Sequence, residues 1–170
     1  MEHAPIKQVE ESDLNAILSL QKMAFMEVAK QMNKYDIPPL LQTIQDIRND
    51  FKSCTILKYT SADNQIIGSI RGHISDGNIC HIGKLIVHPA FQNHGIGKAL
   101  MCEIERFFPT CHKFTLFTGE ETPNTLYLYS KIGYQVIYRK EMDGVNFIYM
   151  EKEKMEKLIK EPQKLVHFPK

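Results

Sequence analysis

The chain has few of the features that mark secreted, membrane-bound or nucleic-acid-binding proteins. Its 170 residues include four scattered cysteines and no Cys-x-x-Cys pair, which is typical of free thiols in a reducing cytosol. No apolar run approaches membrane-spanning length, and residues 1–5 lack the basic and apolar regions of a signal peptide. The formal net charge is only +1, so bulk electrostatics recruits neither nucleic acid nor a membrane. We therefore expect a soluble, cytoplasmic protein with neither of those partners.

A metal-binding pattern is also missing. His73, Cys80 and His81 come close across a hairpin turn predicted at Asp76-Gly77, but residues 80 and 81 point to opposite faces of a strand. A shared metal would need them on one face. We expect no metal site.

Hydrophobic periodicity predicts a single domain, which at this length can bury a core of its own. Helices are predicted before Asn33, from Thr43, from Ile96 and over 124–132. The predicted strands cover residues 6–9, 55–59, 66–74, 79–87, 114–118, 134–140 and 145–150. This order predicts an α+β (mixed α/β) domain over 1–151, followed by a charged helix or tail over 152–170.

The most informative segment runs from Leu85 to Leu100, where an apolar strand meets a proline, a glycine turn and a helix start. Such a turn leaves backbone N–H groups unpaired and pointing outward. Together with the positive end of the helix dipole, they form an anion site suited to a phosphate. The residues that present these amides are Gln92, Asn93, His94, Gly95, Ile96, Gly97 and Lys98.

Three glycine-loop interpretations compete with an ordinary tight turn. A P-loop is excluded because Gln92 and Ala99 replace its first glycine and its Mg²⁺-binding hydroxyl. A dinucleotide fingerprint lacks its third glycine, since Leu100 stands there. The remaining pattern is Gln-x-x-Gly-x-Gly, formed by Gln92, Gly95 and Gly97.

A second motif supports that last pattern. The segment from Asn124 to Tyr134 contains Leu-Tyr-x-x-x-Gly-Tyr, with its tyrosine at 129 and its glycine at 133. With both motifs, the sequence resembles the GNAT superfamily of acetyl-CoA-dependent N-acetyltransferases. The resemblance implies a mixed, mostly antiparallel sheet of about seven strands with helices on both faces. It also implies direct transfer of an acetyl group from acetyl-CoA to a primary amine within a ternary complex.

The resemblance assigns cofactor contacts along the chain. The strand over 82–87 would leave its neighbour, helped by Gly83, and open a slot for the pantetheine arm. The backbone of Leu85, Ile86, Val87 and His88 would line that slot, and residues 92–98 would hold the diphosphate. Asn124 would either touch the pantetheine or cap its helix.

Acetyl transfer also sets demands on side chains. The resemblance makes Tyr129 the proton donor to the departing thiolate, with simple packing against the sheet as the alternative. Many relatives place a glutamate base on the strand before the glycine turn, where this chain has His81 and Lys84. The candidate bases are therefore Glu27 and His81, with a water chain as a third route.

Two other functions remain open at this stage. One is a coenzyme A-binding sensor without turnover, and the other is a nucleotide-binding protein. The acceptor pocket is expected near residues 27–43, but the sequence does not identify the acceptor. A homodimer is compatible with the chain on general frequency alone.

Overall fold

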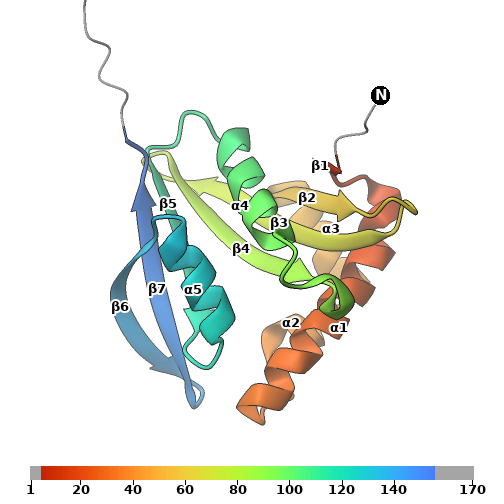
Figure 1. The fold of residues 1–170 in the computed structure, drawn as a ribbon, viewed down its shortest axis with the longest axis horizontal. Helices are drawn as coiled ribbons and strands as arrows, with labels where there is room; N and C mark the ends of the chain where they lie inside the picture. The colour runs from red at the N-terminus through yellow and green to blue at the C-terminus, as the bar shows by residue number, and fades with distance from the viewer. Residues whose placement is uncertain (1–4, 156–170) are drawn as a thin grey trace, which may run out of the picture.

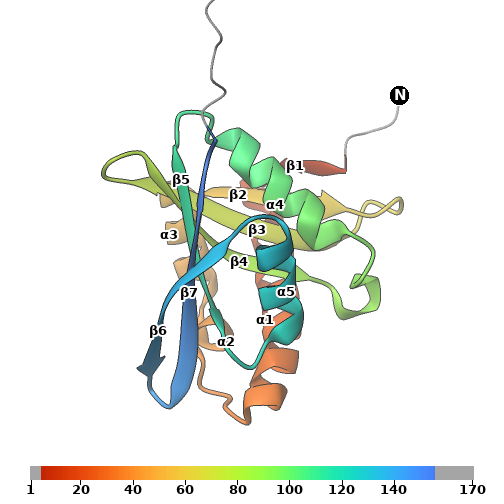
Figure 2. The same cartoon turned by 60° about the vertical axis from the view of Figure 1, so that its left-hand side comes forward.

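The computed structural model describes residues 5–155, which form one seven-stranded sheet with helices on both faces (Figures 1 and 2). The strand order is β1-β2-β3-β4-β5-β7-β6. Every neighbouring pair is antiparallel except β4 with β5, which is parallel. The predicted mixed α/β fold is confirmed.

The observed elements follow the predicted order. They are β1 (Ile6–Gln8), η1 (Glu11–Asp13), α1 (Leu14–Met32), α2 (Pro38–Leu41), α3 (Ile44–Ser53), β2 (Thr55–Thr60), β3 (Ile66–Ser75), β4 (Ile79–Val87), η2 (Pro89–Phe91), α4 (Ile96–Phe107), β5 (Lys113–Gly119), α5 (Pro123–Lys131), β6 (Gln135–Met142) and β7 (Val145–Glu153). The short helix α2 was not predicted.

The end of the domain differs from the prediction. Residues 151–153 belong to strand β7 and pair with β5, with Glu153 opposite Lys113. The prediction of a helix or tail from residue 152 is therefore wrong at this point, because pairing with the neighbouring strand continues past the apolar segment. The rest of the predicted tail, from residue 156 onward, lies outside the described residues.

Strand alternation directs side chains into two separate cores. In β2, Leu57 joins the larger core under α4 and α5, whereas its neighbour Ile56 joins a smaller core with Ile17 of α1 and Ile47 of α3. Figure 1 shows α4 and α5 on one side of the sheet and α1 and α3 on the other. Within residues 5–155, no helix is long and apolar enough to cross a membrane.

Helix α4 lies very close to strand β3, and two glycines make this possible. A Cβ atom at Gly72 would come 2.8 Å from Cε2 of Phe108 and 3.1 Å from Cγ1 of Ile104. A Cβ atom at Gly68 would come 3.0 Å from both Ile96 and Leu100. The missing side chains therefore set the distance between the helix and the sheet.

Replacing Gly72 with Ala should lower the free energy of unfolding by about 1–3 kcal/mol, because the new methyl group overpacks the contact with Phe108. Gly83→Ala is the matched control, since nothing lies within 4 Å of a Cβ atom there. Urea denaturation of both variants would measure the difference. Equal losses at the two positions would contradict this account of the helix–sheet contact.

Candidate functional site

Strands β4 and β5 pair over only three positions and then separate. The parallel pairing covers Ile79 with Lys113, then two further positions, and ends where His81 faces Thr115. Beyond this point β4 continues to residue 87 and β5 to residue 119, and Figure 1 shows the two strands diverging. The separation predicted from the sequence is confirmed. It leaves strand backbone facing an opening without a neighbouring strand.

A β-bulge bends β4 within this opening. Ser69 of β3 pairs with Ile86 and Arg71 with Gly83, so Lys84 and Leu85 together face one residue of β3. Lys84 adopts a left-handed conformation, with φ of +50°, that is uncommon for a residue with a side chain. The unusual backbone therefore lies at Lys84, next to Gly83, where the sequence suggested the departure from regular pairing.

Not all of the predicted backbone donors of β4 face the opening. The N–H of His88 donates to the carbonyl of Ile67 at 2.7 Å. Because bonded and non-bonded pairs alternate along an antiparallel ladder, Ile86 is bonded to β3 as well, whereas Val87 points away from it. The backbone of Ile86, Val87 and His88 was expected to line the slot with its N–H groups; those of Ile86 and His88 are bonded to β3 instead, and that of Val87 remains. The side-chain amide of Gln92 also donates to the Val87 carbonyl at 3.4 Å.

The glycine turn places a row of N–H groups just beyond Val87. Gly95 has a φ of +80° at the start of α4, and the first helical bond runs from Ala99 N–H to its carbonyl at 3.0 Å. The N–H groups of Ile96, Gly97 and Lys98 precede that bond and have no partner within the helix. The turn can therefore bind an anion such as a phosphate.

His94 stabilises this turn through its own backbone contacts. Its Nδ1 lies 2.7 Å from the carbonyl oxygen of Gln92. Because a carbonyl only accepts, Nδ1 carries the proton, and Nε2 is left for another partner. Asn93, beside it, has a φ of +63°. Both residues are exposed at the mouth of the anion site.

Tyr129 lies in the last turn of α5 with 6% of its surface exposed. Its ring centroid lies 6.0 Å from that of Tyr134, whose hydroxyl donates to Oε1 of Glu105 at 2.9 Å. The hydroxyl of Tyr129 makes no hydrogen bond with another group of residues 5–155, which leaves its proton for another acceptor. Burial of the ring raises the pKa of Tyr129 above its ordinary value, which keeps the phenol protonated.

Two other residues of α5 have exposed side chains. Tyr127 is 68% exposed, and the ammonium of Lys131 lies 5.7 Å from its ring centroid. Asn124 does not cap the helix, because Thr122 occupies the N-cap position and Asn124 lies in the first turn. Asn124 is exposed there. The capping prediction is therefore wrong, since the helix begins at Pro123, two residues earlier than a cap at Asn124 would allow.

The predicted bases are both engaged elsewhere. Glu27 is exposed on α1 and forms a 2.9 Å salt bridge with Lys30 on the same helix. The two ring nitrogens of His81 lie 2.6 Å from the hydroxyl of Ser75 and 2.7 Å from that of Thr115. Burial and the neighbouring His73 ring lower the pKa of His81, so the imidazole is neutral at pH 7. His81 thus joins β4 to β5 at the last paired position.

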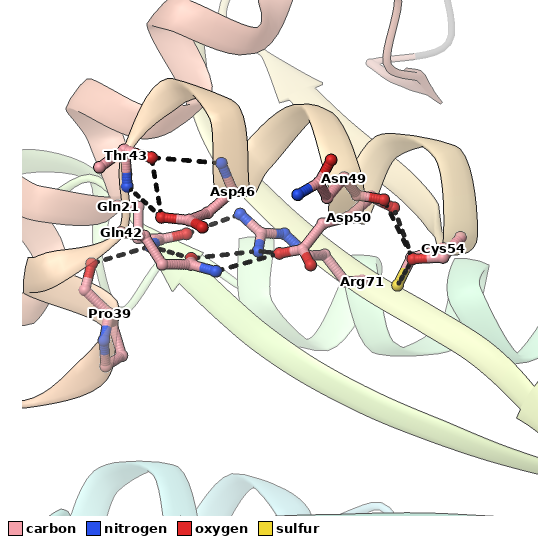
Figure 3. Close-up of polar contacts among 10 residues, drawn as sticks. Gln21, Pro39, Gln42, Thr43, Asp46, Asn49, Asp50, Cys54 and Arg71 are labelled. Atoms are coloured by element: carbon pink, nitrogen blue, oxygen red, sulfur yellow. Dashed lines mark hydrogen bonds and ion pairs between the residues drawn. The ribbon is translucent and has the colours of Figure 1, made fainter.

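A buried polar network, not predicted from the sequence, fixes the helices beside the opening (Figure 3). Arg71 of β3 is 5% exposed and donates to Asp50 of α3 at 2.5 Å and to Gln21 of α1 at 2.6 Å. Gln21 donates in turn to the carbonyl of Pro39 and to the side chain of Gln42. The only sequence signal was a polar residue inside an apolar pattern at 21 and 71. The network holds α1, α2 and α3 against the sheet.

Within residues 5–155, no group of three His, Cys, Asp or Glu side chains is arranged to hold a metal ion.

Comparisons with known proteins agree with this geometry. An uncharacterized N-acetyltransferase, ycf52, of Porphyra purpurea is 23% identical over 139 residues, which are 75% of this chain and 77% of that protein. The crystal structure of PaiA N-acetyltransferase from Thermoplasma acidophilum in complex with coenzyme A has a TM-score of 0.73 at 19% identity. The match covers 88% of this chain and 98% of that one.

A second solved structure, smu.2055 from Streptococcus mutans UA159, has a TM-score of 0.74 at 16% identity and covers 88% of this chain and 99% of its own. At these identities, the solved structures support the fold alone. The sequence profile described as the acetyltransferase (GNAT) domain matches residues 39–154, which is well over half of the chain. The chain therefore belongs to the GNAT acetyltransferase family.

Proposed function

We propose that the protein is an N-acetyltransferase that transfers the acetyl group of acetyl-CoA directly to a primary amine in a ternary complex. The observation that supports this most is the course of β4. The strand leaves β5 after His81 and leads straight into the glycine turn that begins α4. A long substrate with a diphosphate at one end could therefore lie along one continuous stretch of open backbone.

The residues present fit coenzyme A as the carrier of the acetyl group. The N–H groups of Ile96, Gly97 and Lys98, with the helix dipole, would bind the negative diphosphate. The Val87 N–H would bind the pantetheine or the thioester carbonyl. That PaiA N-acetyltransferase was solved in complex with coenzyme A supports the same ligand for this fold.

Two groups of this chain could then assist the reaction. An amide N–H such as that of Val87 can stabilise the negative charge that develops on the carbonyl oxygen. Tyr129 can give its proton to the departing thiolate, because its buried ring keeps the phenol protonated and no group of residues 5–155 binds its hydroxyl. Asn124 and His94, both exposed, would contribute contacts to the carrier.

The amine must lose a proton before it attacks. Both candidate bases, Glu27 and His81, are already engaged in other contacts. Glu27 is held by Lys30, and His81 is held between two hydroxyls. We therefore propose that a chain of water molecules removes the proton. The same observation favours the second candidate function, a coenzyme A-binding protein without turnover.

The proposal also includes a primary amine acceptor, a cytoplasmic location, and no nucleic-acid or membrane partner. The four cysteines are free, as expected for a reducing compartment. A homodimer stays a prediction.

An assay of thiol release from acetyl-CoA over a panel of amines would test the function. We expect release that depends on at least one amine. Tight binding of acetyl-CoA without release on any amine would indicate the non-catalytic alternative. Competition by ADP as strong as that by intact coenzyme A would indicate a nucleotide-binding protein.

Tyr129→Phe should lower kcat by about 100-fold, because a proton donor to the leaving group acts in the transition state. The Kd for acetyl-CoA should change little. Tyr127→Phe is the matched control, since Tyr127 is exposed on the other side of the same helix and should have no effect. Unchanged turnover of Tyr129→Phe, with chemistry rate-limiting, would remove Tyr129 from the mechanism.

Gly95→Ala should weaken coenzyme A binding about tenfold, because relief of about 1–2 kcal/mol of left-handed strain would move the amides of the turn. Gly144→Ala is the control: Gly144 has a φ of +77° and, like Gly95, nothing within 4 Å of a Cβ atom. Both variants should lose similar stability, but only the first should lose affinity in calorimetry. Equal affinities of the two variants for coenzyme A would show that Gly95 has only a structural role.

A further inference from the structure

Lys84 lies at the bulge of β4, on the arm of the opening that carries Val87. Its left-handed backbone is costly for a residue with a Cβ atom, and bulges re-aim side chains next to functional sites. The ammonium lies 5.8 Å from the ring centroid of Phe25 on α1. Lys84 therefore projects onto the α1 side of the sheet, and it is half-buried there.

Helix α1 reaches both arms of the opening. Phe25 contacts Lys84 on the β4 arm, and the sulfur of Met32 lies 4.0 Å from the position of a Cβ atom at Gly119, on the β5 arm. Helices α4 and α5 cover the other face of the sheet. There, Leu128 of α5 lies 3.3 Å from the position that a Cβ atom would take at Gly97 of α4. The acetyl carrier and Tyr129 belong to that second face. An acceptor can therefore approach on the α1 face, where Lys84 lies.

The charges around Lys84 leave one positive charge in excess. Its charged neighbours are Arg71 and Asp50. Asp50 already accepts from Arg71 and from Gln42, so its carboxylate is committed to the buried network. Lys84 forms no salt bridge with the part of the chain that the structure describes. Burial, and after it Arg71, lowers the pKa of Lys84, and the opposite effect of Asp50 does not offset them, so the positive charge of Lys84 is only partly compensated.

Phe117 provides an apolar surface on the opposite arm. It belongs to the part of β5 that no longer pairs with β4, two residues after Thr115 and therefore on the same face of the sheet as Thr115 and His81. Its side chain is 56% exposed, and its ring packs against those of Phe147 and Tyr149 at centroid distances of 5.6 and 5.5 Å. The cation on β4 and the aromatic surface on β5 thus lie on the same face of the sheet, on the two strands that border the opening.

We infer that Lys84 determines acceptor specificity by binding an acidic group, so that the preferred acceptor is an amine that also carries a carboxylate, such as an amino acid. This inference rests on the proposed acetyltransferase function. An acceptor that carries only ammonium groups, such as a polyamine, would meet an uncompensated cation. A carboxylate would supply the missing counter-charge and orient the amine toward the thioester.

Matched pairs of acceptors would test this inference. Each α-, β- and γ-amino acid would be compared with its carboxamide, with rates expressed per unprotonated amine, and 1,4-diaminobutane would serve as the dicationic acceptor. We expect kcat/KM to favour the carboxylate at least about tenfold, mainly through KM, as for a hydrogen bond between charged groups. Stabilisation of the coenzyme A-loaded protein against heat should follow the same order, independently of turnover.

Substitutions would assign the preference to Lys84. Lys84→Met and Lys84→Asn should both remove it, the second because asparagine tolerates a left-handed backbone. Lys84→Arg should restore part of it. Lys131→Met is the matched control, since Lys131 also lies over an aromatic ring, that of Tyr127, but on the exposed side of α5. This control should keep the preference.

The outcomes separate this inference from the proposed function. A wild-type preference for carboxamides or diamines, or a carboxylate preference that survives Lys84→Met, would overturn the inference. A loss of kcat for all acceptors alike would overturn it too, and would make Lys84 a proton acceptor. If nothing is acetylated but carboxylates still stabilise the loaded protein through Lys84, the proposed function fails, and of the inference only carboxylate binding at Lys84 stands. If neither effect is seen, both fail.

Discussion

The whole arrangement depends on the early end of pairing between β4 and β5. Only three parallel pairs join the two halves of the sheet, and the last of them is secured by His81, whose ring lies between hydroxyls from β3 and β5. Beyond that position, backbone N–H and C=O groups are held open by the fold without a partner strand. A sheet that closed completely would hide these groups and remove the site.

The two faces of the opening are supported in different ways. On one face α4 and α5 pack through an apolar core, and the close approach of α4 to β3 depends on Gly68 and Gly72. On the other face α1 and α3 are held to the sheet by hydrogen bonds and an ion pair around Arg71. Such a network is costly to break, because it would leave a buried charge unpaired. It therefore specifies where α1 sits next to Lys84.

Much of this molecule could be predicted from the sequence. The parts that could not be predicted all depend on contacts between residues far apart in the chain. The period-two pattern of 66–74 located β3 to within one residue, and the two glycine motifs located the helix start and the family. The bulge was signalled only by the neighbouring Gly83, because nothing in the sequence marks Lys84 as the residue with a positive φ. Which amides of β4 are free depends on the pairing register with β3. The partners of Gln21 and Arg71 lie far along the chain, beyond the reach of local patterns.

The close seating of α4 on β3 also makes the anion site sensitive to residues that no ligand can touch. Gly68 faces the start of the helix and Gly72 faces its end. Because both lack a side chain, the helix lies equally close to the strand at its two ends. Side chains at those positions would tilt or lift the helix axis. The N–H groups at the start of the helix would then lose their alignment with Val87, although no residue of the opening itself had been substituted.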